Sequence, residues 1–139
     1  MTDQEKIREL KQYRWLLKEE RQLRDELHTL RLQAVPGAIR YDGSGIRGPD
    51  SDRMAEWVAR IEKTERKLSK AIERCNAQRR TIEAGIGMIR DSRERIIIRR
   101  RYVNGEKFED IADSIGYTRQ YVYVLHRRGI KHYRSRRQQ

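Results

Sequence analysis

The 139-residue chain contains one cysteine, two prolines, one phenylalanine and no long hydrophobic run. A single cysteine excludes an internal disulfide, and because Cys75 falls on an apolar helical position we expect it to be buried. No apolar stretch reaches the length of a membrane span, and the first residues lack the apolar segment of a signal peptide. We therefore expect an intracellular protein.

Residues that could carry catalysis are also scarce. The three histidines, His28, His126 and His132, lie far apart without cysteines or carboxylates at ligand spacing, so we predict no metal site. No nucleophile–base pair is evident, and we predict no enzyme activity. The segment Gly43–Gly48 spells G-x-G-x-x-G, but proline-bearing loop sequence surrounds it instead of a strand and a helix. We therefore predict no cofactor.

Positive charge is abundant. The net charge is +12 at pH 7, with 33 Lys/Arg and 21 Asp/Glu. Residues 88–139 hold 14 of these basic residues and only 6 acidic ones, and no acidic residue follows Ser114. A strongly basic surface attracts polyanions, so the charge favours nucleic acid as a partner. The uneven distribution indicates that the two parts of the chain have different roles.

Two long helices are expected in the first part of the chain. Residues 3–33 contain no proline or glycine and place apolar residues at alternating spacings of three and four, with Glu20 at one of these positions. A second helix is expected from Ser51 or Asp52, with a regular apolar seam interrupted by Glu65 and Arg79. The seam positions are Tyr13, Leu16, Leu23, Leu27 and Leu30 in the first helix, and Met54, Val58, Ile61, Leu68, Ile72, Cys75, Ile82 and Ile86 in the second.

These helices predict an all-α protein that begins with a long antiparallel, coiled-coil-like hairpin. Residues 34–50 hold both prolines and four of the nine glycines, and we expect a loop there. We assign residues 1–87 to the hairpin and residues 88–139 to a small C-terminal domain. Since a two-helix hairpin alone buries little surface, we expect it to form a homo-oligomer or to bind a partner. The alternative is a hairpin that packs only on its own C-terminal domain.

A helix-turn-helix pattern follows a glycine-containing break at residues 85–88 and a short helix at residues 91–102. Ala112 is small where two helices must cross, and Gly116 suits a left-handed turn. Thr118 can cap the second helix. The residues predicted to form the core and turn of the motif are Ile111, Ala112, Ile115, Gly116, Val122 and Leu125.

The second helix of this motif, residues 118–131, is the predicted recognition helix for the DNA major groove. Arginine pairs with guanine, glutamine with adenine, and valine contacts the thymine methyl group. The candidate base-reading residues are Thr118, Arg119, Gln120, Tyr121, Tyr123, Val124 and Arg127. The candidate contacts to the DNA backbone are Arg128, Lys131, Arg134, Arg136 and Arg137. For Tyr123 partial burial is the alternative, and for His126 we favour a surface position.

Residues 93–133, RERIIIRRRYVNGEKFEDIADSIGYTRQYVYVLHRRGIKHY, resemble region 4 of the sigma-70 factors. The shared features are the RRRY helix end, the short glycine-containing turn, IADSIG, and an arginine just after the threonine cap. The order of hairpin and motif resembles phage late-gene transcriptional activators of the RinA and ArpU type. This resemblance implies a DNA-binding transcription regulator in the bacterial cytoplasm, associated with the nucleoid, and is compatible with a contact to RNA polymerase.

Two other functions remain open at this point. Small terminase subunits, which are DNA-packaging adapters of phages, also combine a helix-turn-helix with an oligomerising hairpin. A structural coiled coil whose basic end serves solubility is the third hypothesis. A dimer on paired half-sites favours regulation, whereas a ring of eight or more copies favours packaging.

Overall fold

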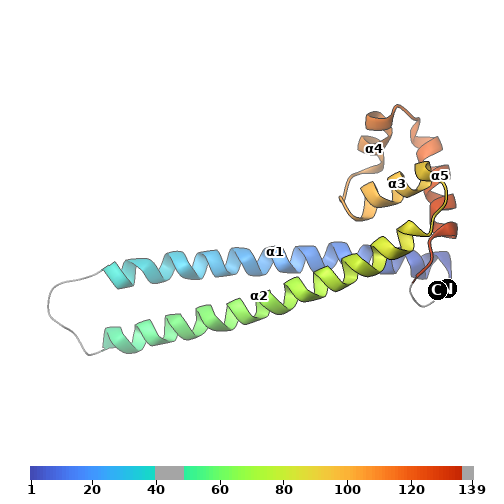
Figure 1. Cartoon of the computed structure of the whole chain (residues 1–139). Coiled ribbons are helices and arrows are strands. Elements are labelled where there is room, and N and C mark those ends of the chain that lie inside the picture. Colours follow the sequence, from blue (N-terminus) through green and yellow to red (C-terminus); the bar gives the residue numbers. More distant parts are fainter. Residues whose placement is uncertain (40–48, 136–139) are drawn as a thin grey trace. The chain divides into compact units, whose positions relative to one another are not determined.

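The computed structural model describes residues 1–39 and 49–135, which form five helices and no strand (Figure 1). The predicted all-α fold class is confirmed. In chain order the helices are α1 (Asp3–Ile39), α2 (Pro49–Gly87), α3 (Ser92–Tyr102), α4 (Phe108–Ile115) and α5 (Arg119–His132). None of these described helices is both long and apolar enough to cross a membrane.

The helices belong to two compact units. Unit 1 comprises Met1–Leu17 and Arg74–Gln139, and unit 2 comprises Lys18–Glu73. Unit 1 therefore joins the start of α1 and the end of α2 to all three short helices. The hairpin predicted for residues 1–87 spans both units and stays a prediction as a whole.

The ends of the long helices differ from the prediction. The first helix continues through Pro36 and Gly37 to Ile39 instead of ending near residue 33, and the second begins at Pro49. Pro36 lies in the last turn of α1, where its missing N–H removes one hydrogen bond to the preceding turn. Proline suits the first position of a helix, where its N–H has no intrahelical partner. The central part of the predicted loop, residues 40–48, lies outside the described residues.

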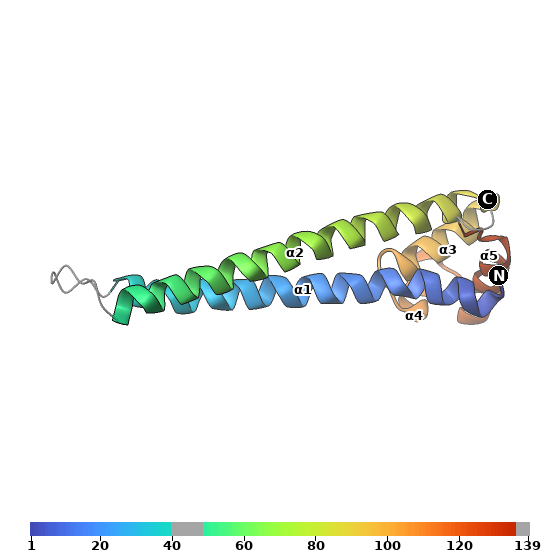
Figure 2. The same cartoon turned by 90° about the horizontal axis from the view of Figure 1, so that it is seen from below.

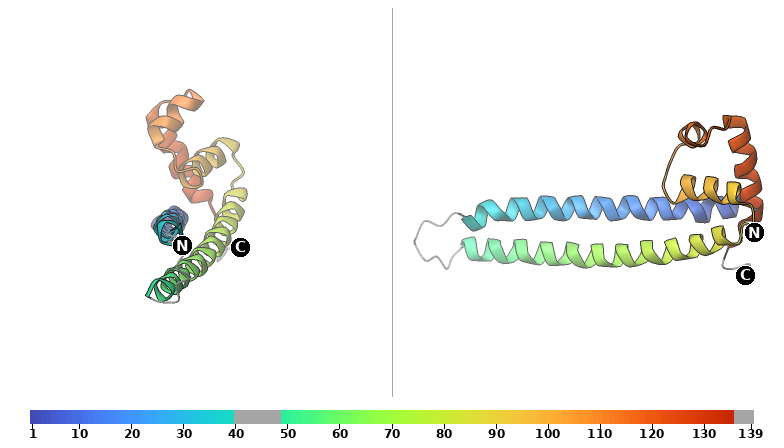
Figure 3. Two further views of the ribbon diagram at one scale, coloured as in Figure 1. Left: turned by 90° about the vertical axis from the view of Figure 1, so that its left-hand side faces the viewer. Right: turned by 45° about the horizontal axis from the view of Figure 1, so that its top comes forward.

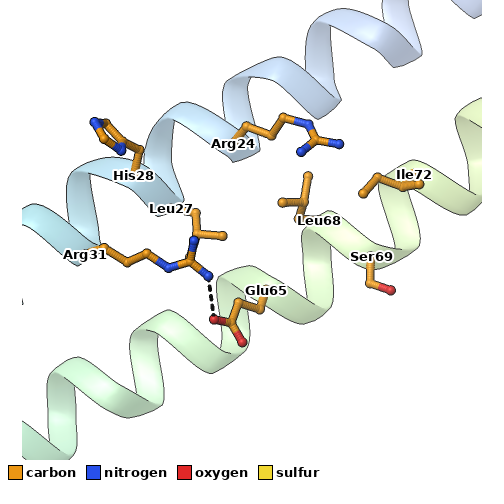
Figure 4. A pocket seen from close by; sticks show the side chains of 8 residues that line it. All are labelled: Arg24, Leu27, His28, Arg31, Glu65, Leu68, Ser69 and Ile72. Atoms are coloured by element: carbon orange, nitrogen blue, oxygen red, sulfur yellow. Dashed lines mark hydrogen bonds and ion pairs between the residues drawn. The ribbon is translucent and has the colours of Figure 1, made fainter.

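Unit 2 holds adjacent segments of α1 and α2. Leu27 and Leu68 are buried, and Arg31 Nη2 lies 3.0 Å from Glu65 Oε1 across the two helices (Figure 4). The predicted seam of α2 is wrong in detail, because Val58 is 45% exposed whereas Thr64 is buried. Thr64 and Ala71 have small side chains that let two helices approach closely. They are therefore buried between the helices, whereas some larger neighbouring residues are exposed.

Unit 1 has a first core that joins α1 and α2 to α3 and α5. Its central side chains are fully buried, and Cys75 in α2 is buried as predicted. The members of this cluster are Leu10, Tyr13, Ile82, Ile86, Ile89, Ile98, Tyr102, Val103, Ile130 and Tyr133. The last helix of the motif is thus held by residues from the beginning of the chain.

A second core lies between the three short helices, which gather together in the further views (Figures 2 and 3). It consists of Ile97, Ile111, Ala112, Val122 and Leu125, with Phe108, Ile115 and Tyr121 packed at its margin. Helix α5 contacts both α3 and α4. The motif therefore rests on α3 as its third helix.

Two glycines allow close packing in unit 1. A Cβ atom on Gly85 would lie 2.4 Å from Tyr133 Cε2 and 2.7 Å from the Arg134 carbonyl oxygen. A Cβ atom on Gly129 would lie 2.7 Å from Ile98 Cγ1. These positions need glycine because the Tyr133 ring and the Arg134 carbonyl group fill the space at Gly85, and the Ile98 side chain fills it at Gly129. For Gly85 the sequence predicted a bend, and α2 does end two residues later at Gly87.

Candidate nucleic-acid interface

The turn between α4 and α5 has the geometry of a helix-turn-helix. Gly116 ends α4 with a φ of 72°, in the left-handed region that favours glycine. The next amide, that of Tyr117, donates to the Ala112 carbonyl oxygen at 3.1 Å. The Thr118 hydroxyl accepts a hydrogen bond from the Tyr121 amide at 3.2 Å and caps α5. Thr118 is therefore engaged in the turn, although it was predicted to read bases.

Burial separates the two faces of α5. Val122, Leu125 and Gly129 lie inside, and Ile115 of α4 is half-buried at the corner. On the opposite face, helical spacing aligns five side chains, of which Val124 is half-buried and the others are exposed. They are Gln120, Tyr123, Val124, Arg127 and Lys131, and we call this set the outer face.

Tyr123 was predicted either to be exposed for base reading or to be partly buried, and it has features of both. The residue is 45% exposed, and its ring also contacts Phe108 edge-on, with the ring centroids 5.1 Å apart. The hydroxyl end of a tyrosine held in this way remains available for a polar partner.

Arg119 lies at one margin of the outer face and has a protein partner. Its Nη2 atom is 2.9 Å from Glu109 Oε2 on α4, and both side chains are largely exposed. An exposed pair of this kind contributes little to stability. A contact of Arg119 to a base would therefore compete with Glu109, whereas Arg127 and Gln120 have no such competitor among the described ion pairs.

One edge of α5 is lined by Tyr121 and by Arg93 of α3. The Arg93 Nη1 atom donates to the Tyr121 hydroxyl oxygen at 2.9 Å, and the Tyr117 ring packs edge-on against Tyr121 at 5.0 Å. Arg93 also contacts Asp91, the N-cap of α3. The side-chain hydrogen bond from Arg93 and the backbone N–H groups lower the pKa of Asp91 to about 2.

The other edge of α5 holds His126, which differs from the expected surface position. Its Nε2 atom lies 2.7 Å from the Tyr102 hydroxyl oxygen, and its ring packs against Phe108 with a centroid distance of 5.0 Å. Burial and, to a smaller extent, the positive charges of Arg101 and Lys11 lower the pKa of His126 to about 4. His126 is therefore neutral at pH 7.

This neutral histidine makes stability depend on pH. In the unfolded chain the pKa returns to about 6.5, so the unfolded state binds more protons between pH 6.5 and pH 4. Stability is thus fully present above pH 6.5 and falls as the pH drops towards 4. After allowance for partial exposure, we expect a loss of about 2 kcal/mol in the free energy of unfolding over this range.

Chemical unfolding at pH 7 and at pH 4.5 measures this loss. We expect His126→Gln to remove most of the pH dependence in this window, because the amide keeps a hydrogen bond to Tyr102 without titrating. His28→Gln is the matched control, since His28 is exposed and lies in unit 2. A pH dependence that is unchanged in His126→Gln would contradict the assignment.

Two cations of α1 hold the C-terminal ends of the short helices, a role that the sequence did not reveal. Lys6 is buried, and its Nζ atom donates to the carbonyl oxygens of Ile130 at 3.1 Å and Lys131 at 3.0 Å. Arg14 Nη1 donates to the Val103 carbonyl oxygen at 3.0 Å, at the end of α3. Terminal carbonyl groups lack intrahelical partners and carry negative partial charge, so a cation there stabilises the helix.

The predicted backbone-contact residues have different positions. Arg128, Lys131 and Arg134 are exposed, whereas Arg136 and Arg137 lie outside the described residues. Beside them, His132 Nδ1 lies 2.7 Å from the buried carboxylate of Glu94, which links α5 to α3.

The net charge is concentrated in the unit that carries the outer face. Unit 1 contains 21 Lys/Arg and 10 Asp/Glu, whereas unit 2 contains 12 and 11. Unit 1 therefore accounts for almost all of the net charge of +12. Within residues 1–39 and 49–135, no group of His, Cys, Asp and Glu side chains is arranged to hold a metal ion.

Comparisons with known proteins found no match to this chain. No protein-family model, no curated protein and no solved structure matches the chain.

Proposed function

We propose that this protein is a sequence-specific double-stranded DNA-binding transcription regulator, a phage or prophage late-gene activator in which α5 enters the major groove. The observation that carries the proposal is the outer face of α5. This face presents Gln120, Tyr123 and Arg127 to solvent, with Val124 half-buried among them, on a helix whose other side is packed against α3 and α4.

The chemistry of the outer face suits base recognition. The guanidinium of Arg127 matches the two acceptors of guanine, and the amide of Gln120 matches the donor and acceptor of adenine. Val124 offers an apolar contact to the thymine methyl group. Lys131 at the end of this face and Arg128 beside it suit contacts to phosphates. The net charge of unit 1 provides long-range attraction to DNA.

Homo-oligomerisation through the long helices is part of the proposal. Unit 2 is almost electrically neutral, so two copies can approach there without strong repulsion. Mass photometry of the purified protein measures the oligomeric state. A dimer supports regulation on paired half-sites, whereas a ring of eight or more copies would favour a DNA-packaging adapter of the small terminase type.

Selection of bound duplexes from a random pool, followed by titration of the selected site and of scrambled DNA, tests the proposed function. We expect Arg127→Ala to weaken binding to the selected site by about 1–3 kcal/mol and to relax its sequence preference, because one bidentate base contact is lost.

Two control variants sharpen this experiment. Arg119→Ala should have the smaller effect, since Arg119 already pairs with Glu109. Arg128→Ala should weaken binding to selected and scrambled DNA alike, because a phosphate contact carries no sequence information. Equal losses on both DNAs for Arg127→Ala would exclude it as a base-reading residue, and failure to enrich any duplex sequence would contradict the proposed function.

A further inference from the structure

The face of α1 that lies towards α3 and α5 in unit 1 carries an exposed lysine. Ile7, Lys11 and Arg14 share this face, since they are spaced by four and three residues. Ile7 packs against the first core, and Arg14 reaches the Val103 carbonyl oxygen at the end of α3. These two residues fix the orientation of the face. Lys11 lies between them and is exposed.

A second cation lies at the same edge of α5. The guanidinium carbon of Arg101 lies 4.3 Å from the centroid of the Phe108 ring, and its Nη1 atom donates to the Glu106 carbonyl oxygen at 3.1 Å. The Phe108 ring in turn contacts both Tyr123 and His126 of α5. Arg101 is therefore held beside the outer face by an aromatic platform.

His126 lies at the same edge of α5 and is neutral at pH 7. After burial, the positive charges of Arg101 and Lys11 are further causes that lower its pKa. Being neutral at pH 7, His126 adds no repulsion and no counter-charge at this edge. Tyr123 and Arg127 are the members of the outer face that lie on either side of His126 in the sequence.

Two carboxylates that follow Arg101 in the sequence already have other partners. Glu106 pairs with Arg100, and Glu109 pairs with Arg119. Neither Lys11 nor Arg101 forms an ion pair within the described part of the chain. The two cations are thus available to an external anion.

A helix in the major groove has a sugar–phosphate strand on each side, and basic residues at both edges suit this geometry. Arg93 and Arg128 flank the outer face on the side of Tyr121. We propose that Lys11 and Arg101 form a phosphate-binding edge on the opposite side, so that helix α1 itself contacts the backbone of the duplex bound by α5. This inference rests on the proposed function and adds a DNA contact from a helix that the sequence assigned to oligomerisation.

The salt dependence of binding tests the proposal. The probe is a fluorescein-labelled duplex of about 30 base pairs and mixed sequence, titrated with the full-length protein by fluorescence anisotropy over about 50–300 mM KCl. Each phosphate contact contributes about 0.9 to the slope of log K against log salt concentration. We expect Lys11→Gln to reduce this slope by about that amount and to weaken binding several-fold, while Lys11→Arg retains the slope of the unmodified protein.

Matched controls separate the possible outcomes. Lys63→Gln makes the same chemical change on an exposed position of unit 2 and should leave the slope unchanged. Because Lys11 is exposed, the thermal melt of Lys11→Gln should match that of the unmodified protein. An unaltered slope for Lys11→Gln, in a protein whose binding is weakened by Arg128→Ala, overturns this inference alone. If the unmodified protein binds no duplex, the proposed function is overturned together with it.

Discussion

Replacing Gly85 by alanine should destabilise unit 1 by about 2 kcal/mol or more, although alanine is the better helix former. The new Cβ would lie 2.4 Å from the Tyr133 ring and 2.7 Å from the carbonyl oxygen of Arg134. A backbone carbonyl cannot rotate away as the end of a flexible side chain can, so the segment after α5 must move. Because Tyr133 is fully buried in the first core, that movement opens the packing between α2 and α5.

Gly87 provides the matched control for this substitution. It lies two residues further along the same helix, and a Cβ atom there would meet nothing within 4 Å. We expect Gly87→Ala to be neutral or to stabilise the protein by up to about 1 kcal/mol, since only helix propensity changes. Thermal and urea unfolding of the two variants measures the difference. Equal stabilities of the two variants would show that α2 and the Tyr133 segment are not in close contact.

Replacing Lys6 by methionine is expected to have the second large effect. Methionine keeps the length and apolar stem of the side chain but removes the ammonium group that binds the carbonyl oxygens of Ile130 and Lys131. Both carbonyls lie at the end of α5, and charge-assisted hydrogen bonds to them are stronger than neutral ones. We expect a loss of about 3 kcal/mol in the free energy of unfolding.

The proposed DNA binding should weaken in the same variant, because the end of α5 loses its hydrogen bonds to Lys6 of α1. Lys63→Met is the control, since it removes one exposed lysine from unit 2 and should change the stability by less than about 0.5 kcal/mol. Hydrogen exchange of the α5 amides locates the effect. Faster exchange in the last turn of α5 is expected for Lys6→Met, and unchanged exchange there would contradict the capping role of Lys6.

Much of the local structure could be predicted from the sequence because local signals determine it. The spacing from Ile111 to Leu125 indicates two helices around a glycine corner, and the structure places Gly116 in the left-handed conformation with Thr118 as the cap. Apolar spacing also predicted both long helices. The ends of those helices were less predictable. Pro36 indicates a helix end in the sequence, but α1 continues past it to Ile39.

Contacts between distant parts of the chain could not be predicted in this way. Lys6 and Arg14 resemble any other cations on an amphipathic helix, and only the folded chain brings them to the ends of α5 and α3. His126 falls at the margin of α5, where burial depends on Tyr102 and Phe108 from other helices. Glycine at position 85 suggested a bend, whereas its role in packing depends on Tyr133. The roles of such residues can be predicted only when the tertiary structure is known.

The hydrogen bond from Lys6 to Ile130 joins residues 124 positions apart in the sequence. During synthesis α1 leaves the ribosome long before α5 exists, so the first core of unit 1 can close only when most of the chain has been made. Closing so long a loop costs entropy and slows folding relative to a domain built from neighbouring segments. Nascent chains are therefore expected to remain unable to hold α5 in place until translation has passed Tyr133.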